Sequence, residues 1–126
     1  MSVLAGCAGV GAGDSIEGLL AAPGDAGRGR EVFVAREGGH CVLCHSVPGV
    51  AVAGNVGPPL AGVGSRLTAG QIRLRIVDIT RVNPDAAMPA FHRTEGVERV
   101  ASNYAGRPAL DAQQVEDLVA WLGTLK

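Results

Sequence analysis

Residues 38–49 read GGHCVLCHSVPG, and six consecutive positions in this segment hold two cysteines and two histidines. These residues are His40, Cys41, Cys44 and His45. Two thiols separated by two residues and followed at once by a histidine form the attachment signature of a c-type haem. The spacing lets both sulfurs meet one edge of the porphyrin while the adjacent imidazole is presented to the iron. We therefore expect one haem c, bound covalently through Cys41 and Cys44, with His45 as an axial iron ligand.

Two other kinds of site use cysteines at this spacing. A thioredoxin-like dithiol lies near a βαβ pattern, and the chain has no alternating stretch that would indicate a sheet. A zinc site needs four ligands at the corners of a tetrahedron, and His45 stands too close to Cys41 and Cys44 to complete one comfortably. The haem interpretation is therefore favoured over both.

Met88, in the segment NPDAAMPAFH, is the candidate for the second axial ligand. A thioether favours ferrous iron and raises the reduction potential relative to a second imidazole. Pro84 and Pro89 stiffen the segment, and a residue that precedes a proline is held extended, which would aim Met88 at one place. His92 is the rival ligand. An open iron position, which would suit a gas sensor or a peroxidase, is the least favoured arrangement.

The composition fits a small cofactor protein. The chain has 126 residues, enough for one domain, and its formal net charge of −1 gives no reason to expect nucleic acid as a partner. Aromatic residues make up only 3%, so the porphyrin would itself fill the centre of the fold. No apolar run reaches the roughly 18 residues that a membrane span needs. The three cysteines are an odd number and imply no disulfide framework.

Residues 1–27 differ from the rest of the chain, and we expect a remnant of a signal or lipobox region followed by a linker. The segment LAGC, from Leu4 to Cys7, resembles a bacterial lipobox, in which the cysteine carries lipid. A single acyl anchor at Cys7 would tie the protein to a membrane surface without spanning the membrane. An unmodified cysteine in a tail is the alternative. Residues 28–126 then form the haem domain.

Three stretches of the haem domain have helical patterns. Residues 28–39 open with charge and end at two glycines, which is a helix stop signal. Residues 68–78 begin with a capping box and carry isoleucines at helical spacing. Residues 111–125 begin with an acidic cap and form one apolar stripe. Loops rich in glycine and proline join them, so the sequence predicts an all-α fold.

The segment GNVGPPLAGVGSR resembles the Gly-Pro-x-Leu loop of class I cytochromes c. That resemblance implies that the carbonyl of Pro58 holds His45, that Leu60 packs on the haem ring, and that Arg66 faces a haem propionate. A ligating imidazole generally donates its second N–H to such a carbonyl, which fixes the orientation of the ring.

The first and last helices are similar to those of the same family. The segments GREVF and EDLVAWL resemble its N- and C-terminal helices, which cross with Gly29 against the other backbone and Phe33 near Trp121. Glycine permits such a close approach because it has no side chain. The resemblance implies a class I cytochrome c-like single haem domain, with these two helices crossing around a covalent haem.

A narrower resemblance covers residues 28–126. The segments RIVDITRVNPDAAMPAF and RVASNYAGRPALDAQQVEDLVAWLGTLK resemble SoxX, the monohaem subunit of the SoxAX cytochrome of bacterial sulfur oxidation. The segment from His92 to Leu110 is longer than the matching connection in a simple class I cytochrome. With Arg93, Arg99 and Arg107 it is predicted to form part of a partner surface.

The resemblance to SoxX implies an electron-transfer subunit in a heterodimer with a SoxA-like cytochrome that carries one or two haems. In that family the partner joins thiosulfate oxidatively to a cysteine of the SoxYZ carrier protein, an L-cysteine S-thiosulfotransferase reaction. SoxX receives the electrons and passes them to a downstream cytochrome. No residue of this chain is expected to be a catalytic nucleophile.

The alternative function is a free-standing class I shuttle that docks on a terminal oxidase or reductase. A docking face for such a shuttle would have to use arginine, because Lys126 is the chain's one lysine. For either function we expect a periplasmic location, because bacteria attach haem c outside the cytoplasm. An acylated Cys7 would add a membrane anchor.

Overall fold

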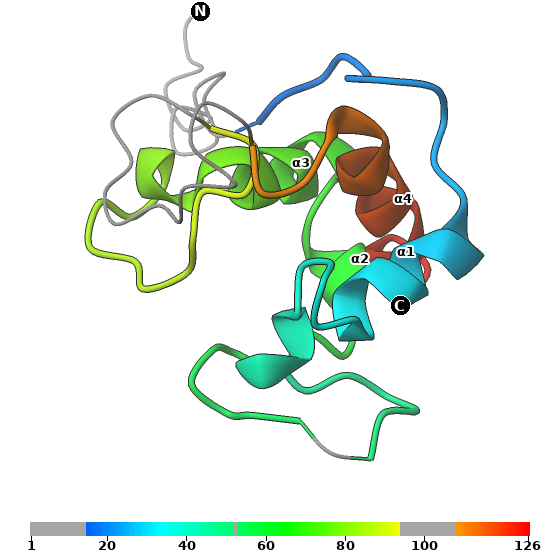
Figure 1. Ribbon diagram of the computed structural model, residues 1–126, viewed down its shortest axis with the longest axis vertical. Helices are drawn as coiled ribbons and strands as arrows, with labels where there is room; N and C mark the ends of the chain where they lie inside the picture. Colours follow the sequence, from blue (N-terminus) through cyan, green and yellow to red (C-terminus); the bar gives the residue numbers. More distant parts are fainter. Residues whose placement is uncertain (1–14, 52, 94–107) are drawn as a thin grey trace, which may run out of the picture.

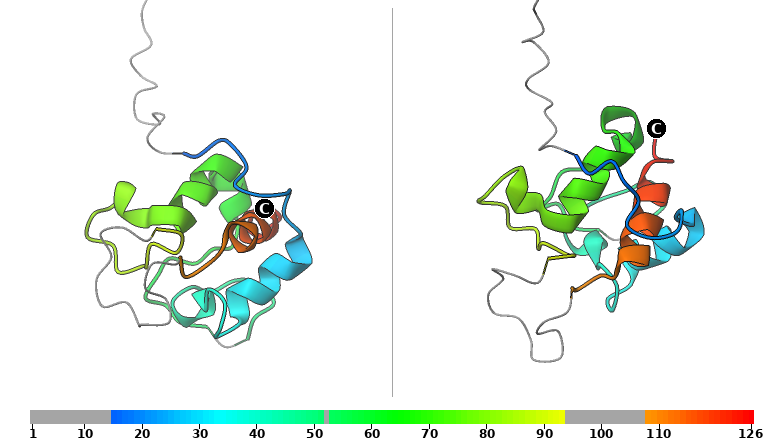
Figure 2. Two further views of the ribbon diagram at one scale, coloured as in Figure 1. Left: turned by 45° about the horizontal axis from the view of Figure 1, so that its top comes forward. Right: turned by 90° about the horizontal axis from the view of Figure 1, so that it is seen from above.

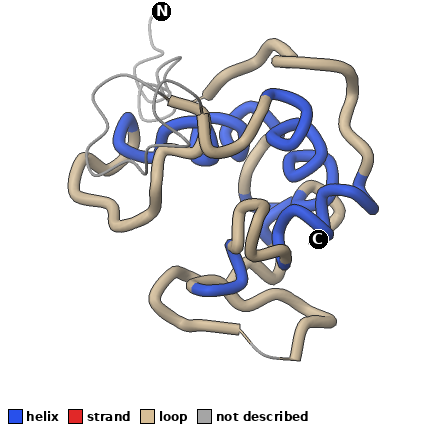
Figure 3. Tube along the Cα trace, in the orientation of Figure 1, coloured by secondary structure: helices blue, strands red, loops and turns tan. Residues whose placement is uncertain are grey.

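The computed structural model describes residues 15–51, 53–93 and 108–126 (Figure 1). These residues form short helices and no strand, which confirms the predicted all-α class (Figure 3). No helix in the described ranges has the length and apolar character needed to cross a membrane. In chain order the elements are α1 (Ala26–Val34), the 3-10 turn η3 (Cys41–Leu43), α2 (Val63–Arg66), α3 (Ala69–Asp78), the 3-10 turn η4 (Ile79–Arg81) and α4 (Ala112–Leu122).

Helices α1 and α4 cross in direct backbone contact, as the family resemblance implies. A Cβ atom on Gly29 of α1 would lie 1.9 Å from the carbonyl oxygen of Asp117 in α4, so only glycine fits at this position. One turn further along α1, the centroids of the Phe33 and Trp121 rings are 5.1 Å apart, and the two ring planes are inclined at 59°. Phe33 is almost completely buried. The tilted ring pair fixes the crossing beyond the point of backbone contact.

Helix α1 ends at Val34, earlier than the glycine signal predicts. Gly38 and Gly39 instead form the turn that follows, in which the Gly39 N–H donates to the carbonyl of Val32 over 2.9 Å. A Cβ atom on Gly38 would lie 2.7 Å from that same carbonyl oxygen. The two glycines therefore let the chain fold back on the end of α1, and His40 follows with a left-handed φ of 48°.

The other two predicted helices begin where their caps indicate. Thr68 and Gln71 form both hydrogen bonds of a capping box at the start of α3, and Asp111 and Gln114 do the same for α4. Helix α3 ends at Asp78, whose side chain accepts from the N–H of Thr80 over 3.1 Å and so starts η4.

A buried ion pair joins α3 to α4. Arg73 donates from Nε to Oε2 of Glu116 over 2.7 Å and from Nη2 to Oε1 over 3.0 Å, and the two side chains are only 4% and 1% exposed. The parallel pair of bonds is the strong geometry for a guanidinium and a carboxylate. Neither residue contributes to an apolar stripe, so the sequence pattern does not reveal this contact.

The segment 16–25, which we call the strap, covers this ion pair. The carbonyl of Ile16 accepts from Nη1 of Arg73 over 2.6 Å, and the N–H of Leu20 donates to Glu116 over 3.1 Å. In Figures 1 and 2 the strap lies on the other side of α3 from the cysteine segment. The end of the predicted linker is thus held against the helices. The domain boundary after residue 27 stays a prediction.

Asp117 holds the end of the strap and the start of α1 on α4. Its carboxylate accepts from the N–H of Asp25 over 2.8 Å, from Nε of Arg28 over 3.0 Å and from Nε2 of Gln113 over 3.1 Å. Burial by itself raises the pKa of this carboxyl, but these donors outweigh the burial, and the net pKa of Asp117 is lowered. The Asp117 carboxylate therefore stays ionised to a lower pH than an ordinary aspartate.

The α1–α4 contact predicts the effect of a single methyl group. Gly29→Ala should lower the free energy of unfolding by about 3 kcal/mol, because the added carbon meets backbone that cannot yield without separating the helices. Chemical denaturation measures this change. Gly27→Ala in the same helix is the control, since its Cβ would meet only a side-chain oxygen of Asp25 at 3.2 Å. Equal stabilities for the two variants would contradict the close crossing.

Candidate functional site

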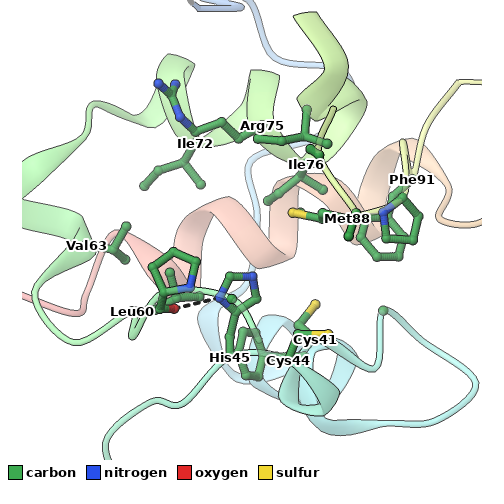
Figure 4. Close-up of a pocket in the computed structure, with 18 of the residues that line it drawn as sticks. Cys41, Cys44, His45, Leu60, Val63, Ile72, Arg75, Ile76, Met88 and Phe91 are labelled. Carbon is green, nitrogen blue, oxygen red and sulfur yellow. Dashed lines mark hydrogen bonds between the residues drawn. The ribbon is translucent and has the colours of Figure 1, made fainter. Parts of the chain in front are cut away.

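A cavity of about 760 Å³ lies between α3 and the cysteine segment (Figure 4). Its wall is largely apolar, and its polar side chains belong to five residues. The apolar wall includes Phe33, Leu60, Val63, Leu67, Ile72, Ile76, Ile79 and Phe91, and the polar residues are His40, His45, Arg66, Arg75 and Asn83.

Helix α3 forms the roof of the cavity because of its repeat. Ile72 and Ile76 are buried, lie one turn apart on the cavity side, and are followed by Ile79 in η4. Arg75 lies on the same wall and donates to the carbonyl of Gln71 over 3.0 Å. The side chain of Arg73, by contrast, extends from α3 toward the strap. One helix therefore serves the cavity with one face and the ion pair with another.

The turn η3 brings the two cysteines and the histidine to the cavity wall. The N–H groups of Cys44 and His45 both donate to the carbonyl of Cys41, over 3.1 and 2.9 Å. The tight turn begins directly after His40, whose backbone is left-handed. Both thiols are free, and both line the cavity together with the imidazole of His45.

The environment of Cys41 disfavours thiolate chemistry. Burial raises the pKa of its thiol to about 12, and the neighbouring Cys44 adds to the increase. A reactive cysteine is a thiolate, which requires the opposite shift. In addition, the described part of the chain contains no group of three His, Cys, Asp or Glu residues placed to hold a metal ion. The dithiol and zinc alternatives gain no support.

The imidazole of His45 is fixed by two neighbours on one loop. Its Nδ1 lies 2.7 Å from the carbonyl oxygen of Pro58, and because a carbonyl only accepts, Nδ1 is the donor. In the neutral ring the other nitrogen, Nε2, then has the free lone pair that an iron ligand needs. A Cβ atom on Gly57 would lie 2.5 Å from Cε1 of the ring, so Gly57 packs closely against the imidazole. The N–H of Gly57 donates to Cys44 over 2.8 Å and closes the loop on the attachment turn.

Met88 reaches the cavity from the segment after η4. It is half-buried, and Figure 4 shows its sulfur turned into the space on the opposite side from His45. The segment is tied to α3, because the N–H of Phe91 donates to the carbonyl of Ile76 over 3.2 Å. The rival ligand His92 is not part of the cavity wall, and its Nδ1 instead lies 2.8 Å from the carbonyl oxygen of Leu110.

Leu60 and Arg66 both lie on the cavity wall, and the contact of Arg66 with a haem propionate stays a prediction. Its Nη1 and Nη2 donate to the carbonyls of Ala61 and Pro59, over 2.6 and 3.3 Å. Leu60 stands between Pro59 and Ala61 in the sequence, and its side chain points to the cavity (Figure 4).

The proposed partner surface and the anchor are described only in part. Arg93 forms an ion pair with Asp78 at 2.9 Å. Arg99, Arg107 and Cys7 lie outside the described residues. Their roles stay predictions.

Sequence reasoning missed two features of the site. The Gly-Pro step marked a turn, yet nothing in it revealed that Gly57 lies against the imidazole. The arginine offset of the family motif indicated Arg66, but the carbonyl oxygens that it contacts are visible only in the folded loop.

The donor set fits a covalently attached haem. Two free thiols, one imidazole whose Nε2 is left for a ligand bond and one thioether all face one large apolar cavity. Thiols form the links to a haem c, while an imidazole and a thioether are the axial ligands of cytochromes c.

Comparisons with known proteins agree with this geometry. The family described as cytochrome c matches residues 26–126. Among solved structures, the chain is similar to a chain in the crystal structure of SoxXA from P. pantotrophus, with 34% sequence identity and a TM-score of 0.82. The similarity covers 90% of this chain and 91% of that chain. No curated protein matched significantly. The resemblance to SoxX seen in the sequence is confirmed.

The contact between Gly57 and His45 gives a test of the loop. In Gly57→Ala the new carbon would overlap the imidazole, so either the ring or the loop must move, at a cost of about 1–3 kcal/mol. Thermal unfolding and the NMR signals of the His45 ring measure both effects. Gly18→Ala, where the added carbon meets nothing within 4 Å, is the control. Unshifted imidazole signals in Gly57→Ala would contradict the contact.

Proposed function

The chain belongs to the cytochrome c family, and on that premise we propose that it is the electron-transfer subunit of a thiosulfate-oxidising SoxAX complex. Membership of the family implies a covalently bound haem c and an electron-transfer role. The similarity to SoxXA over nine-tenths of both chains is the observation that supports the narrower assignment. We propose one haem, since the sequence contains one attachment signature.

Four side chains would hold this haem. Cys41 and Cys44 would form its two thioether links, and His45 and Met88 would be the axial ligands of its iron. The support is their convergence on one cavity from two separate segments of the chain. When bound, the haem iron supplies the chemistry, which is the uptake and release of one electron.

The protein's own contribution is to keep these ligands still. The bond from His45 to Pro58 and the contact with Gly57 fix the imidazole plane, so the ligand needs little rearrangement when the charge at the site changes. The apolar wall formed by Ile72, Ile76 and other side chains would keep water from the bound haem, and a dry site raises the cost of the more highly charged state.

The partner would supply the sulfur chemistry. We propose that a SoxA-like subunit binds this chain and joins thiosulfate to a SoxYZ cysteine, and that this chain passes the electrons to a downstream cytochrome. Within the described residues the cysteines Cys41 and Cys44 would both be consumed by the haem, which is consistent with a non-catalytic subunit. We also propose that the protein is located in the periplasm and that lipid on Cys7 anchors it to a membrane surface.

Removal of the thioether tests the ligand assignment. In Met88→Ala the iron should lose the second of its two protein ligands, so the reduction potential should fall or the optical spectrum should become high-spin. Spectroelectrochemistry measures both properties. His92→Ala is the matched control, because His92 does not line the cavity and its loss should leave the ligand bands unchanged. The reverse pattern would assign the ligand to His92.

Co-purification tests the complex. Tagged, haem-loaded protein recovered from the periplasm of the native host grown on thiosulfate should carry a second cytochrome in equal amount, identified by mass. Thiosulfate and the SoxYZ carrier should then reduce the haem of the recovered pair. Recovery of this chain alone, with no reduction by thiosulfate, would support the free-standing shuttle instead.

A further inference from the structure

We propose that Arg66 is a positioning residue: its guanidinium clamps the carbonyls of Pro59 and Ala61 and thereby holds Pro58 against the imidazole of His45. The inference rests on the proposed function, because it gives the clamp a purpose in haem ligation. This role is distinct from the propionate contact that the family resemblance implies for this arginine, and it does not exclude that contact.

The loop that carries the Pro58 carbonyl needs an external donor. Pro58 and Pro59 have no N–H groups, so two successive residues cannot donate to the surrounding backbone. Hydrogen bonds hold the loop on either side of the two prolines. The N–H of Gly57 donates to the carbonyl of Cys44 over 2.8 Å, and the N–H of Leu60 donates to the carbonyl of Ser46 over 2.9 Å.

The guanidinium supplies that donor. One of its outer nitrogens reaches the carbonyl of Pro59, directly after Pro58, and the other reaches that of Ala61, at 3.3 and 2.6 Å. Two parallel donors on one rigid plane fix the distance between these carbonyls, which a single point donor cannot do.

The clamp is mounted on an anchored helix. Helix α2 packs against the end of α4, since the N–H of Gly64 donates to the carbonyl of Leu125 over 2.8 Å and Val63 is buried. A Cβ atom on Gly64 would lie 2.4 Å from the carbonyl oxygen of Gly123, so the two backbones are in close contact. Arg66 therefore reaches the loop from a fixed base.

The turn before α2 leaves room for the guanidinium. Gly62 has a left-handed φ of 78°, and a Cβ atom there would lie 3.1 Å from Nη1 of Arg66. A side chain at this position would be strained and would press on the clamp. The end of α4, α2, Arg66 and the proline loop thus form one connected path to the imidazole.

Hydrogen exchange of the His45 Nδ1–H in the holoprotein tests the path. We compare Arg66→Lys, Arg66→Gln and Arg66→Leu, and record the reduction potential of each. Lysine keeps the charge but donates from a single point, and glutamine loses the charge and also cannot bridge two carbonyls. The clamp therefore predicts that the Nδ1–H exchanges roughly fivefold faster in both the Lys and the Gln variants, a modest change because exposed hydrogen bonds contribute modestly. The Leu variant, which has no donor at all, should exchange faster still.

A second arginine provides the matched control. Arg30 is exposed and donates to the carbonyl of Gly49 at 3.4 Å, so it also contacts a loop carbonyl, but it is not part of the cavity wall. Arg30→Gln should leave both the exchange rate and the potential unchanged.

Two results would overturn the proposal. A Lys variant equal to the wild type, with Gln and Leu equally impaired, would assign a role of charge alone to Arg66. Unchanged exchange in all three variants would remove any positioning role. The wild-type optical spectrum is recorded first, since a chain that takes up no haem contradicts the proposed function. The same exchange comparison on the haem-free chain still decides on the clamp.

Discussion

The contact of α1 with α4 at Gly29 is the constraint on which the other positions depend. Helix α4 meets α1 through backbone, α3 through the Arg73–Glu116 ion pair, and α2 through the carbonyls at its own end. The cysteine turn follows α1, and the proline loop leads into α2. A shift of α4 would therefore move the thiols, the roof of the cavity and the support of the imidazole together.

The cavity is an assembly of weakly structured pieces held by stronger ones. The residues proposed to hold the haem come from the cysteine turn and the segment after η4, and the His45 imidazole is held by a proline loop; none of these segments has a hydrophobic repeat of its own. Backbone hydrogen bonds tie the segment after η4 to α3, and they tie the proline loop to Cys44 and Ser46 of the cysteine segment. Such a design places polar donors around an apolar space without a large aromatic core, and it leaves room for a flat cofactor to complete the packing.

Local and family patterns predicted much of this structure. The capping boxes at Thr68 and Asp111 are local signals and were sufficient to start two helices, and the family motif placed Gly29 correctly. The end of α1 was predicted wrongly, because Gly38 and Gly39 serve the turn that folds back on the helix. The Arg73–Glu116 pair and the carbonyl partners of Arg66 could not be predicted, since both depend on residues that only the tertiary fold brings together.

The crossing of α1 and α4 also has a consequence for the order of folding. Its contacts join residues 89 positions apart, such as Arg28 and Asp117, whereas the bonds of the cysteine turn span three or four residues. Closing a long segment of chain costs more entropy than closing a short one, and contacts between distant residues slow folding. The turn that presents both thiols can thus form while the ends of the chain are still apart. Both thiols would therefore be accessible in an open segment before α1 and α4 close the fold around them.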